Sequence, residues 1–412
     1  MPKPARDVTC PHCAETNPAR AFNLVDTDGN RYDHNGAPLV VDTETMSNPR
    51  SLSRLFAGRP PRKRRQTQSE RLDLLARDLD IECPHCREHL SSAFLKRKSI
   101  FVAVVGESSS AKTSFLSASI VKWRDGDDIV DAGVSYSPEE QSETFTQAVE
   151  RMFIDHVAPG TTMPGGRREP LIIVARSKAN AVNIVLIDVS GEDLVNARKM
   201  AATTRFIAIA SHIFVLVTPM IALGDRNRPI ARAILSNQRV ATNIADATGD
   251  NSQSTDTLLQ IISGIHELQN GDGRQIAAPH RGVFVVLTKA DMLTGLLDSE
   301  EFAPHIDGVI PPHNWIHGAG SGSDDIDVDT IEDTSVRTRA LIRAMHPNIG
   351  SNLHTSFPTA KYFAVSASGC PAKRDLDGEF RFENVVPYRC SDPFLSMLRA
   401  IPELNLAFSR QD

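Results

Sequence analysis

Six apolar runs rich in β-branched residues constrain the fold of this chain more than any other feature. They are IFVAVVG (100–106), PLIIVARS (170–177), VNIVLIDV (182–189), HIFVLVTP (212–219), GVFVVLTK (282–289) and KYFAVSAS (361–368). Near-continuous apolar runs are typical of strands covered on both faces, as in largely parallel sheets. Only KANA separates the second run from the third, which predicts an antiparallel hairpin, whereas the other gaps can hold crossover helices. The sequence therefore predicts an α/β fold with a six-stranded, mostly parallel sheet and helices on both faces.

A short repeat near the start of the chain indicates a metal site. TCPHCAE (9–15) and ECPHCRE (82–88) each contain a Cys-x-x-Cys pair, and together they supply Cys10, Cys13, Cys83 and Cys86. Four thiolates in two such pairs form the ligand set of a structural Zn²⁺ site. Reactive thiols or two separate sites are the alternatives, but a redox Cys-x-x-Cys needs a βαβ context that is missing here. The 69 residues between Cys13 and Cys83 are a long excursion for such a site.

These features divide the chain into two predicted domains. Residues 1–96 would form a small four-cysteine zinc-ribbon domain, interrupted by a basic insertion over 14–82. Residues 97–409 would form the α/β domain, with insertions near 220–281 and 296–357. The second insertion contains GAGSGSDDIDVDTIEDTS (318–335), whose acidic, Gly/Ser-rich composition predicts an irregular loop.

The charge is distributed unevenly along the chain. Residues 1–98 hold 17 basic and 13 acidic side chains, a net charge of +4. The remainder holds 28 basic and 38 acidic side chains, a net charge of −10, so it offers no general surface for nucleic acid. RPPRKRR (59–65) is the segment that could contact a polyanion, and a solvated linker is the equal alternative. The longest apolar stretch, 212–223, is too short to cross a bilayer, so we expect a cytoplasmic protein without membrane contact.

The first apolar run leads into a candidate phosphate-binding loop. GESSSAKT (106–113) follows a predicted strand, precedes a predicted helix and nearly matches G-x-x-x-x-G-K-[ST]. Backbone N–H groups of 108–113 would surround a phosphate, Lys112 would neutralise its charge, and Thr113 would bind Mg²⁺. Ala111 replaces the second glycine, which costs about 1–2 kcal/mol if its φ is positive. If its φ is helical, alanine instead stabilises the loop by about 1 kcal/mol relative to glycine. A serine-rich strand-to-helix turn is the alternative. The predicted nucleotide contacts in this loop are Gly106, Ser109, Ser110, Ala111, Lys112, Thr113 and Ser114.

Three later segments follow predicted strands in an order that fits nucleotide binding. LIDVSG provides Asp188, for Mg²⁺ through a bound water, and Gly191, whose N–H would meet a γ-phosphate. LTKAD provides Asp291 for guanine N1 and N2. VSAS provides a backbone N–H near Ala367 for guanine O6. Ligands of open α/β sheets bind at the carboxyl ends of the strands. The predicted base contacts are Thr288, Lys289, Asp291, Ser366 and Ala367.

With these motifs, residues 98–405 resemble the Ras-like P-loop GTPases of the translation-factor (TRAFAC) class. GESSSAKT, DVSG, TKAD and SAS correspond in order to the family's G1, G3, G4 and G5 boxes. The zinc ribbon and the large insertions make the chain similar to the bacterial double-GTPase proteins of conflict and defence systems. The sequence departs from the family pattern at Ala111, at Thr288, where many members have Asn, and at Ser368, where many have Lys.

The resemblance implies a switch I threonine and a group that orients water. APGTTMPGG (158–166) offers Thr161 and Thr162, of which we favour Thr162, although unremarkable loop threonines are nearly as good an interpretation. Glu192 stands where the family usually has Gln. A carboxylate beside a γ-phosphate is a poor substitute because both are negatively charged, so we expect slow hydrolysis. The predicted catalytic residues are Lys112, Thr113, Thr162, Asp188, Gly191 and Glu192.

These observations predict a GTPase switch that binds GTP or GDP with Mg²⁺, carries structural Zn²⁺ and recognises a protein partner through the zinc ribbon. Two alternatives belong to other classes. One is a GTP-binding scaffold without meaningful hydrolysis. The other is a nucleic-acid-binding zinc protein, acting through 59–65, that the nucleotide regulates.

Overall fold

The computed structural model describes part of the chain. The described residues are 7–33, 36, 37, 39, 79–107, 110–125, 135–140, 143–159, 170–178, 180–190, 205–223, 229, 252–270, 282–293, 328–375 and 379–405. They fall into two compact units, residues 1–99 and 100–412. Among the described helices, none has the length and hydrophobicity that crossing a membrane requires.

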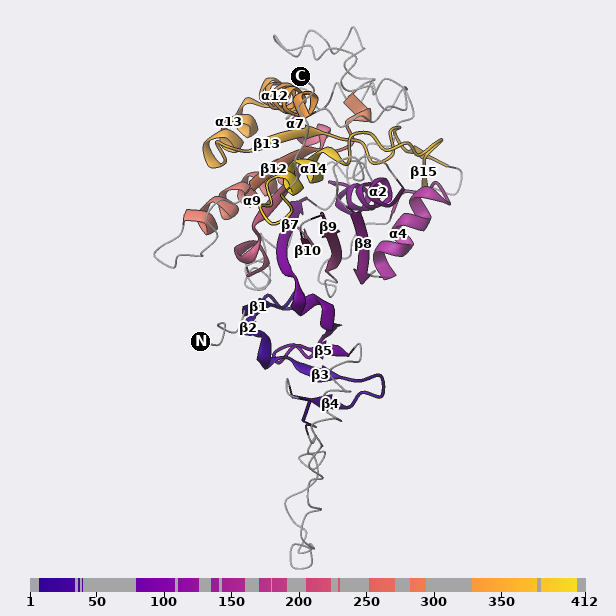
Figure 1. The fold of residues 1–412 in the computed structure, drawn as a ribbon. Helices are drawn as coiled ribbons and strands as arrows, with labels where there is room; N and C mark the ends of the chain where they lie inside the picture. Colours follow the sequence, from indigo (N-terminus) through magenta and orange to yellow (C-terminus); the bar gives the residue numbers. More distant parts are fainter. Residues whose placement is uncertain are drawn as a thin grey trace, which may run out of the picture. The chain divides into compact units, whose positions relative to one another are not determined.

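The first unit is built from two similar hairpins (Figure 1). β1 (Asp7–Thr9) pairs with β2 (Thr16–Pro18), and β5 (Asp80–Glu82) pairs with β6 (His89–Ser91), both antiparallel. A short 3-10 helix follows each hairpin, η1 (Ala19–Ala21) and η3 (Ser92–Lys96). Within the excursion between the repeats, β3 (Asn23–Val25) pairs with β4 (Arg31–Tyr32) and with β5, which gives a sheet of order β4-β3-β5-β6. The sequence repeat is therefore also a structural repeat.

The second unit is an α/β fold around one large sheet. The sheet order is β13-β12-β11-β7-β10-β9-β8, and the six predicted apolar runs all contribute strands to it. These are β7 (Lys98–Gly106), β9 (Leu171–Arg176), β10 (Ala181–Ser190), β11 (His212–Val217), β12 (Gly282–Leu287) and β13 (Lys361–Ala364). β7, β11, β12 and β13 run parallel, and β9 and β10 form the predicted antiparallel hairpin.

A seventh strand, β8 (Ser135–Glu140), extends the sheet beyond the six that the sequence predicts. Its sequence, SYSPEE, is not an apolar run, and it pairs antiparallel with β9 at the edge of the sheet. The register shifts between Pro138 and Glu140, as expected where a proline interrupts the ladder. An edge strand needs fewer apolar residues, so a search for apolar runs misses it.

Both faces of the sheet are buried. In β7, β11 and β12, residues that point to opposite faces are equally inaccessible, so each face is covered. One face packs against α2 (Lys112–Asp125) and α14 (Asp392–Arg399), where the rings of Phe115, Phe214 and Phe394 meet. The remaining described helices include α4 (Glu143–Phe153), α7 (Pro219–Ala222) and α9 (Ser252–Asn270).

The second predicted insertion contains a helix where the sequence predicts a loop. α12 (Val328–Met345) begins inside the acidic stretch, packs on β13 and is followed by α13 (Pro347–Ser356). Its buried positions are Ile331, Thr334, Ser335, Thr338, Leu341, Ile342 and Met345. This is helical spacing, but small hydroxyl residues replace apolar ones in the first two turns. Thr338 Oγ1 donates a hydrogen bond to the Thr334 carbonyl, and Ser335 Oγ accepts one from the Tyr362 N–H. Because both hydroxyl groups have hydrogen-bond partners, they can be buried. The loop prediction is therefore wrong for residues 328–335.

Candidate functional site

The candidate phosphate loop lies between β7 and α2, as its sequence predicts. Gly106 ends β7, and a Cβ at this position would lie 2.5 Å from Ser110 Oγ and 3.1 Å from the Leu216 carbonyl oxygen. Real Cβ atoms essentially never approach other atoms as closely as 2.5 Å. Close contact with Ser110 of the same loop and with Leu216 of β11, rather than an unusual φ, therefore favours glycine here.

Ala111 occupies the conformation that glycine would adopt most easily. Its φ is 58°, in the left-handed region, where a Cβ costs about 1–2 kcal/mol. The Ala111 carbonyl accepts the N–H of Phe115 at 2.9 Å, so this residue also begins the hydrogen bonding of α2. The backbone turn that leads into α2 therefore carries local strain at Ala111.

The Lys112 ammonium is folded back into its own loop. Nζ donates to the carbonyl oxygens of Gly106 at 3.0 Å and Glu107 at 2.6 Å, and only 6% of the residue is exposed. Ser110 Oγ also donates to the Glu107 carbonyl, at 2.7 Å. A buried positive charge thus lies at the N-terminus of α2, where backbone N–H groups also favour anions.

Two threonines at the ends of neighbouring strands hold this loop. Thr288 follows β12, and its Oγ1 donates to the Ser110 carbonyl at 2.9 Å. Thr218 follows β11, and its Oγ1 donates to Glu107 Oε1 at 3.3 Å. Both threonines are buried. The GESSSAKT and LTKAD segments, about 175 residues apart in the sequence, are therefore in direct contact.

The two predicted base-binding segments also meet. Ser366 Oγ donates to Asp291 Oδ1 at 2.5 Å, and the Ala290 N–H donates to the Val365 carbonyl at 3.0 Å. Burial raises the pKa of the Asp291 carboxyl, and the hydrogen bond from Ser366 offsets this only in part. Lys289 has a φ of 53°, so the backbone turns sharply just before Asp291. The two strand ends form one carboxylate-containing edge.

Other predicted residues are placed as follows. Thr113 and Ser114 lie in the first turn of α2, and Asp188 lies near the end of β10, the strand beside β7. Ala367 follows Ser366 and is half-buried. The predicted residues Ser109, Thr162, Gly191 and Glu192 lie outside the described residues.

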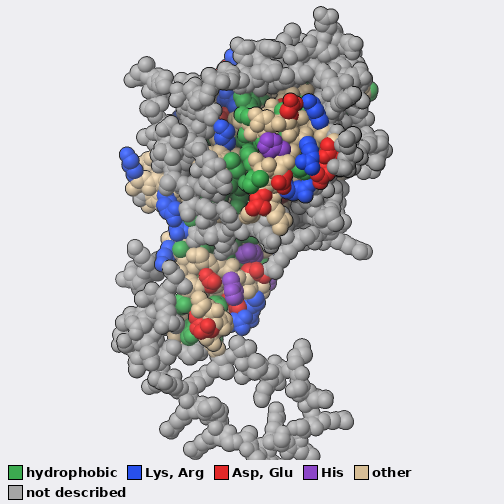
Figure 2. Space-filling view, turned by 90° about the vertical axis from the view of Figure 1, so that its right-hand side faces the viewer, with side chains coloured by type: hydrophobic (Ala, Val, Ile, Leu, Met, Phe, Trp, Pro, Cys, Tyr) green, Lys and Arg blue, Asp and Glu red, His purple; other side chains and the backbone are tan. Residues whose placement is uncertain are grey.

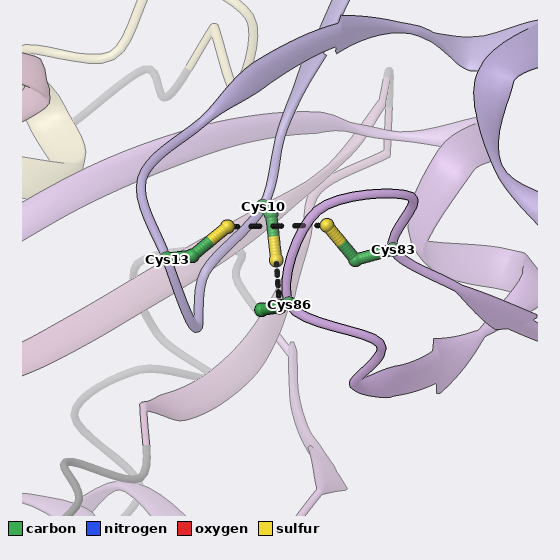
Figure 3. Close-up of side chains that lie close together, drawn as sticks. All are labelled: Cys10, Cys13, Cys83 and Cys86. Carbon is green, nitrogen blue, oxygen red and sulfur yellow. Dashed lines mark hydrogen bonds between the residues drawn. The ribbon is translucent and has the colours of Figure 1, made fainter. Parts of the chain in front are cut away.

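The four N-terminal cysteines form one cluster (Figure 3). The sulfurs of Cys10 and Cys86 are 3.7 Å apart, those of Cys13 and Cys83 are 3.9 Å apart, and all four lie within 4.8 Å of one another. Zn–S bonds of about 2.3 Å in a tetrahedron imply sulfur–sulfur distances of about 3.8 Å. The cluster is therefore compatible with Zn²⁺, and four thiolates would leave no open coordination position.

Matching turns present the two cysteine pairs. The Ala14 N–H donates to the Cys10 carbonyl and the Arg87 N–H to the Cys83 carbonyl, each at 3.0 Å. Ala14 and Arg87 have φ values of 61° and 66°. Burial raises the pKa of the Cys13 thiol to about 12, so without a cation this thiol would stay protonated at neutral pH. A metal ion would supply the charge that makes it a ligand.

Sequence reasoning missed a buried ion cluster beside this site. Glu82 is fully buried immediately before Cys83, and it accepts from Arg31 Nε at 2.7 Å and from Arg87 Nη1 at 2.9 Å. Burial acts to raise the pKa of Glu82, but the hydrogen bonds from the two arginines outweigh it, so the pKa lies below its usual value. The sequence signal is that the two repeats differ at two positions, where Glu82 and Arg87 replace Thr9 and Ala14 of the first repeat.

Comparisons with protein families and with curated proteins find no match to this chain.

Proposed function

We propose that this protein is a guanine-nucleotide-binding switch that binds GTP with Mg²⁺ and hydrolyses it slowly. The observation that carries the proposal is the convergence of three segments distant in sequence. Thr288 bonds the Ser110 carbonyl at 2.9 Å, and Ser366 bonds Asp291 at 2.5 Å. One edge of the sheet thus combines a buried lysine, a helix N-terminus and a carboxylate, which suits a ligand with a phosphate tail and a hydrogen-bonding base.

The loop around Lys112 would bind the phosphates. The ammonium now interacts with two neutral carbonyl oxygens, which phosphate oxygens would replace with stronger, charge-assisted hydrogen bonds. The Thr113 hydroxyl and the Asp188 carboxylate are the groups we assign to Mg²⁺, whose preferred ligands are oxygens. Bound Mg²⁺ would neutralise phosphate charge.

Asp291 would select the base. Guanine presents two donors, N1–H and the N2 amino group, which an ionised carboxylate accepts, whereas the corresponding edge of adenine presents an acceptor. Because burial raises the pKa of Asp291, the two donors of guanine would also favour its ionised form. Lys289 would lie over the ring.

Hydrolysis is expected to be slow because Glu192 replaces the glutamine that usually orients water. This residue also favours the second candidate function, a GTP-binding scaffold in which nucleotide orders a protein interface. The zinc ribbon, with its closed set of four cysteines, would present a surface to the partner rather than take part in chemistry.

The deciding experiment is to identify the nucleotide that copurifies with the protein and to count Zn²⁺ and Mg²⁺ in the same sample. Lys112→Ala should abolish guanine-nucleotide retention, whereas Lys122→Ala, a matched change on the same helix, should not. Unchanged retention in the Lys112 variant would refute the phosphate-loop assignment. Phosphate release that Asp188→Ala abolishes would favour the switch, and no release from the wild-type protein would favour the scaffold.

A further inference from the structure

After the VSAS segment the chain makes an excursion before α14. The described part includes a small hairpin, β14 (Lys373–Arg374) with β15 (Phe380–Arg381), and then returns to Tyr388. We call residues 380–388 the strap. Figure 1 shows β15 beside α4, a helix that lies far from it in the sequence. The strap makes backbone hydrogen bonds at both of its ends.

One end of the strap pairs with the base-binding segment. The Ser366 N–H donates to the Tyr388 carbonyl at 3.0 Å, and the Tyr388 N–H returns the bond at 2.7 Å. The Val386 N–H donates to the Ser368 carbonyl at 2.9 Å. A Cβ on Gly369 would lie 2.0 Å from the Val386 carbonyl oxygen, and the φ of Gly369 is 71°, so close packing and backbone shape both require glycine. This end is tightly fixed.

The other end pairs with residues 156–158, which we call the stem. The Ala158 N–H donates to the Phe380 carbonyl and the Phe382 N–H donates to the His156 carbonyl, both at 2.8 Å. Val157, between them, is buried and faces Arg381 in an antiparallel bridge. The stem directly precedes the segment that holds Thr161 and Thr162, the candidate switch I threonines, which lie outside the described residues.

Ion pairs reinforce the stem end. Arg381 contacts Asp375 at 2.6 Å and Glu379 at 3.0 Å, and Glu379 also lies 3.7 Å from Arg151 of α4. Figure 2, which views the side of the molecule where α4 and β15 lie, shows basic and acidic side chains interleaved on this face. The pairs are exposed, so each contributes little energy, but together they favour one arrangement of hairpin and helix.

The Ser366 hydroxyl joins the strap to the base site. Its Oγ donates to Asp291 and accepts the Gly369 N–H at 2.8 Å. A base that donates to the Asp291 carboxylate would bond beside this hydroxyl, which already occupies one acceptor position on Oδ1. The backbone of Ser366 is bonded to Tyr388, so any shift of Ser366 is transmitted to the strap.

We propose that the strap couples occupancy of the base site to the stem, so that recognition of the base at Asp291 stabilises the backbone arrangement of residues 156–158. This inference rests on the proposed function and deepens it, because it assigns a regulatory connection between base recognition and the stem. Coupling between two sites typically corresponds to a factor of about 5 or more in affinity, and it acts equally in both directions.

The test breaks the strap at the base end and reads the result at the stem. Val386→Pro removes the N–H that bonds Ser368, and Val386→Ala keeps it; the side chain is 59% exposed, so neither change disturbs a core. Hydrogen exchange of the Ala158 amide is measured with and without saturating GDP. We expect GDP to slow exchange about 5-fold or more in the wild-type and Val386→Ala proteins, and less than about 2-fold in Val386→Pro. No slowing in wild-type protein that has bound GDP would overturn the coupling.

A second pair of variants changes the stem and measures the effect at the base site. This pair tests the coupling even if Val386→Pro fails to fold or to bind. Ala158→Pro removes the donor to Phe380, and Ala158→Ser keeps it. GDP should dissociate about 5-fold faster or more from the proline variant than from the serine variant. Equal dissociation rates would overturn the coupling. Failure of the wild-type protein to bind any guanine nucleotide would instead refute the proposed function, so the two failures are distinguishable.

Discussion

Replacing Ala111 with glycine tests whether the candidate phosphate loop is strained. At a φ of 58° the Ala111 Cβ costs about 1–2 kcal/mol, which glycine would recover. Glycine also lowers the free energy of unfolding by about 0.5–1 kcal/mol, because it has more conformational freedom in the unfolded chain than alanine has. The difference predicts that Ala111→Gly stabilises the second unit by about 0.8 kcal/mol, within a range of about 0 to 1.5 kcal/mol.

The same substitution in an ordinary helix should have the opposite sign. Ala148 is buried within α4, and Ala148→Gly should destabilise by about 1 kcal/mol or more, because glycine disfavours helix and a buried methyl group is lost. Urea unfolding can follow both variants through the fluorescence of Trp123, whose ring centroid lies 4.5 Å from that of Phe394 in the core. A lower midpoint for Ala111→Gly, comparable to that of Ala148→Gly, would refute the left-handed conformation and the argument built on it.

Three further predictions concern the metal cluster, the sheet and the loop. Cys86→Ser should lower the Zn²⁺ content after dialysis against a mild chelator, as measured by mass spectrometry of the metal; a full equivalent in the variant would contradict the four-cysteine site. Burial lowers the pKa of His212 from 6.5 in the unfolded chain to about 4 in the folded protein. Below pH 6.5 the unfolded chain therefore binds a proton that the folded protein does not, and the free energy of unfolding should fall by about 3 kcal/mol as the pH approaches 4. His212→Gln should lack this component of the pH dependence in urea unfolding, and identical profiles would show that the buried imidazole does not titrate. Thr288→Val removes the hydroxyl donor to Ser110 and should destabilise the second unit by about 1 kcal/mol, whereas Thr288→Ser should not; equal losses in urea unfolding would point to packing instead.

The sheet was predictable because its strands are covered on both faces. Burial on both sides demands apolar residues at every position, so the six runs stand out from the rest of the sequence. β8 and α12 were not predictable in the same way. β8 is an edge strand with a proline, and α12 buries Thr334, Ser335 and Thr338, whose hydroxyl groups find partners that only the folded structure reveals.

The candidate site was predictable to the extent that it depends on local motifs. Two Cys-x-x-Cys pairs predict that the four cysteines lie close together in the fold, because one Zn²⁺ ion needs four ligands. Glu82 and Thr218 carry no motif, and their importance comes from partners that lie 51 and 111 residues away. The strap could not be predicted either, because its contacts are hydrogen bonds between backbone groups, which almost every residue type can form.

Backbone conformation marks these regions independently of any motif. Left-handed φ values are costly for residues with a Cβ, and they persist where the surrounding structure fixes the chain. Seven non-glycine residues among those described have such φ values: Ala14, Arg87, Ala111, His156, Lys289, Arg389 and Asn405. Ala14 and Arg87 lie in the cysteine turns, Ala111 lies in the candidate phosphate loop, and Lys289 lies two residues before Asp291. His156 and Arg389 lie at the two ends of the strap contacts. Only Asn405 lies outside these regions. Strain is thus concentrated in the cysteine cluster, the candidate nucleotide site and the strap. This is the distribution expected if those three regions are the ones that the fold must hold in a fixed geometry for function.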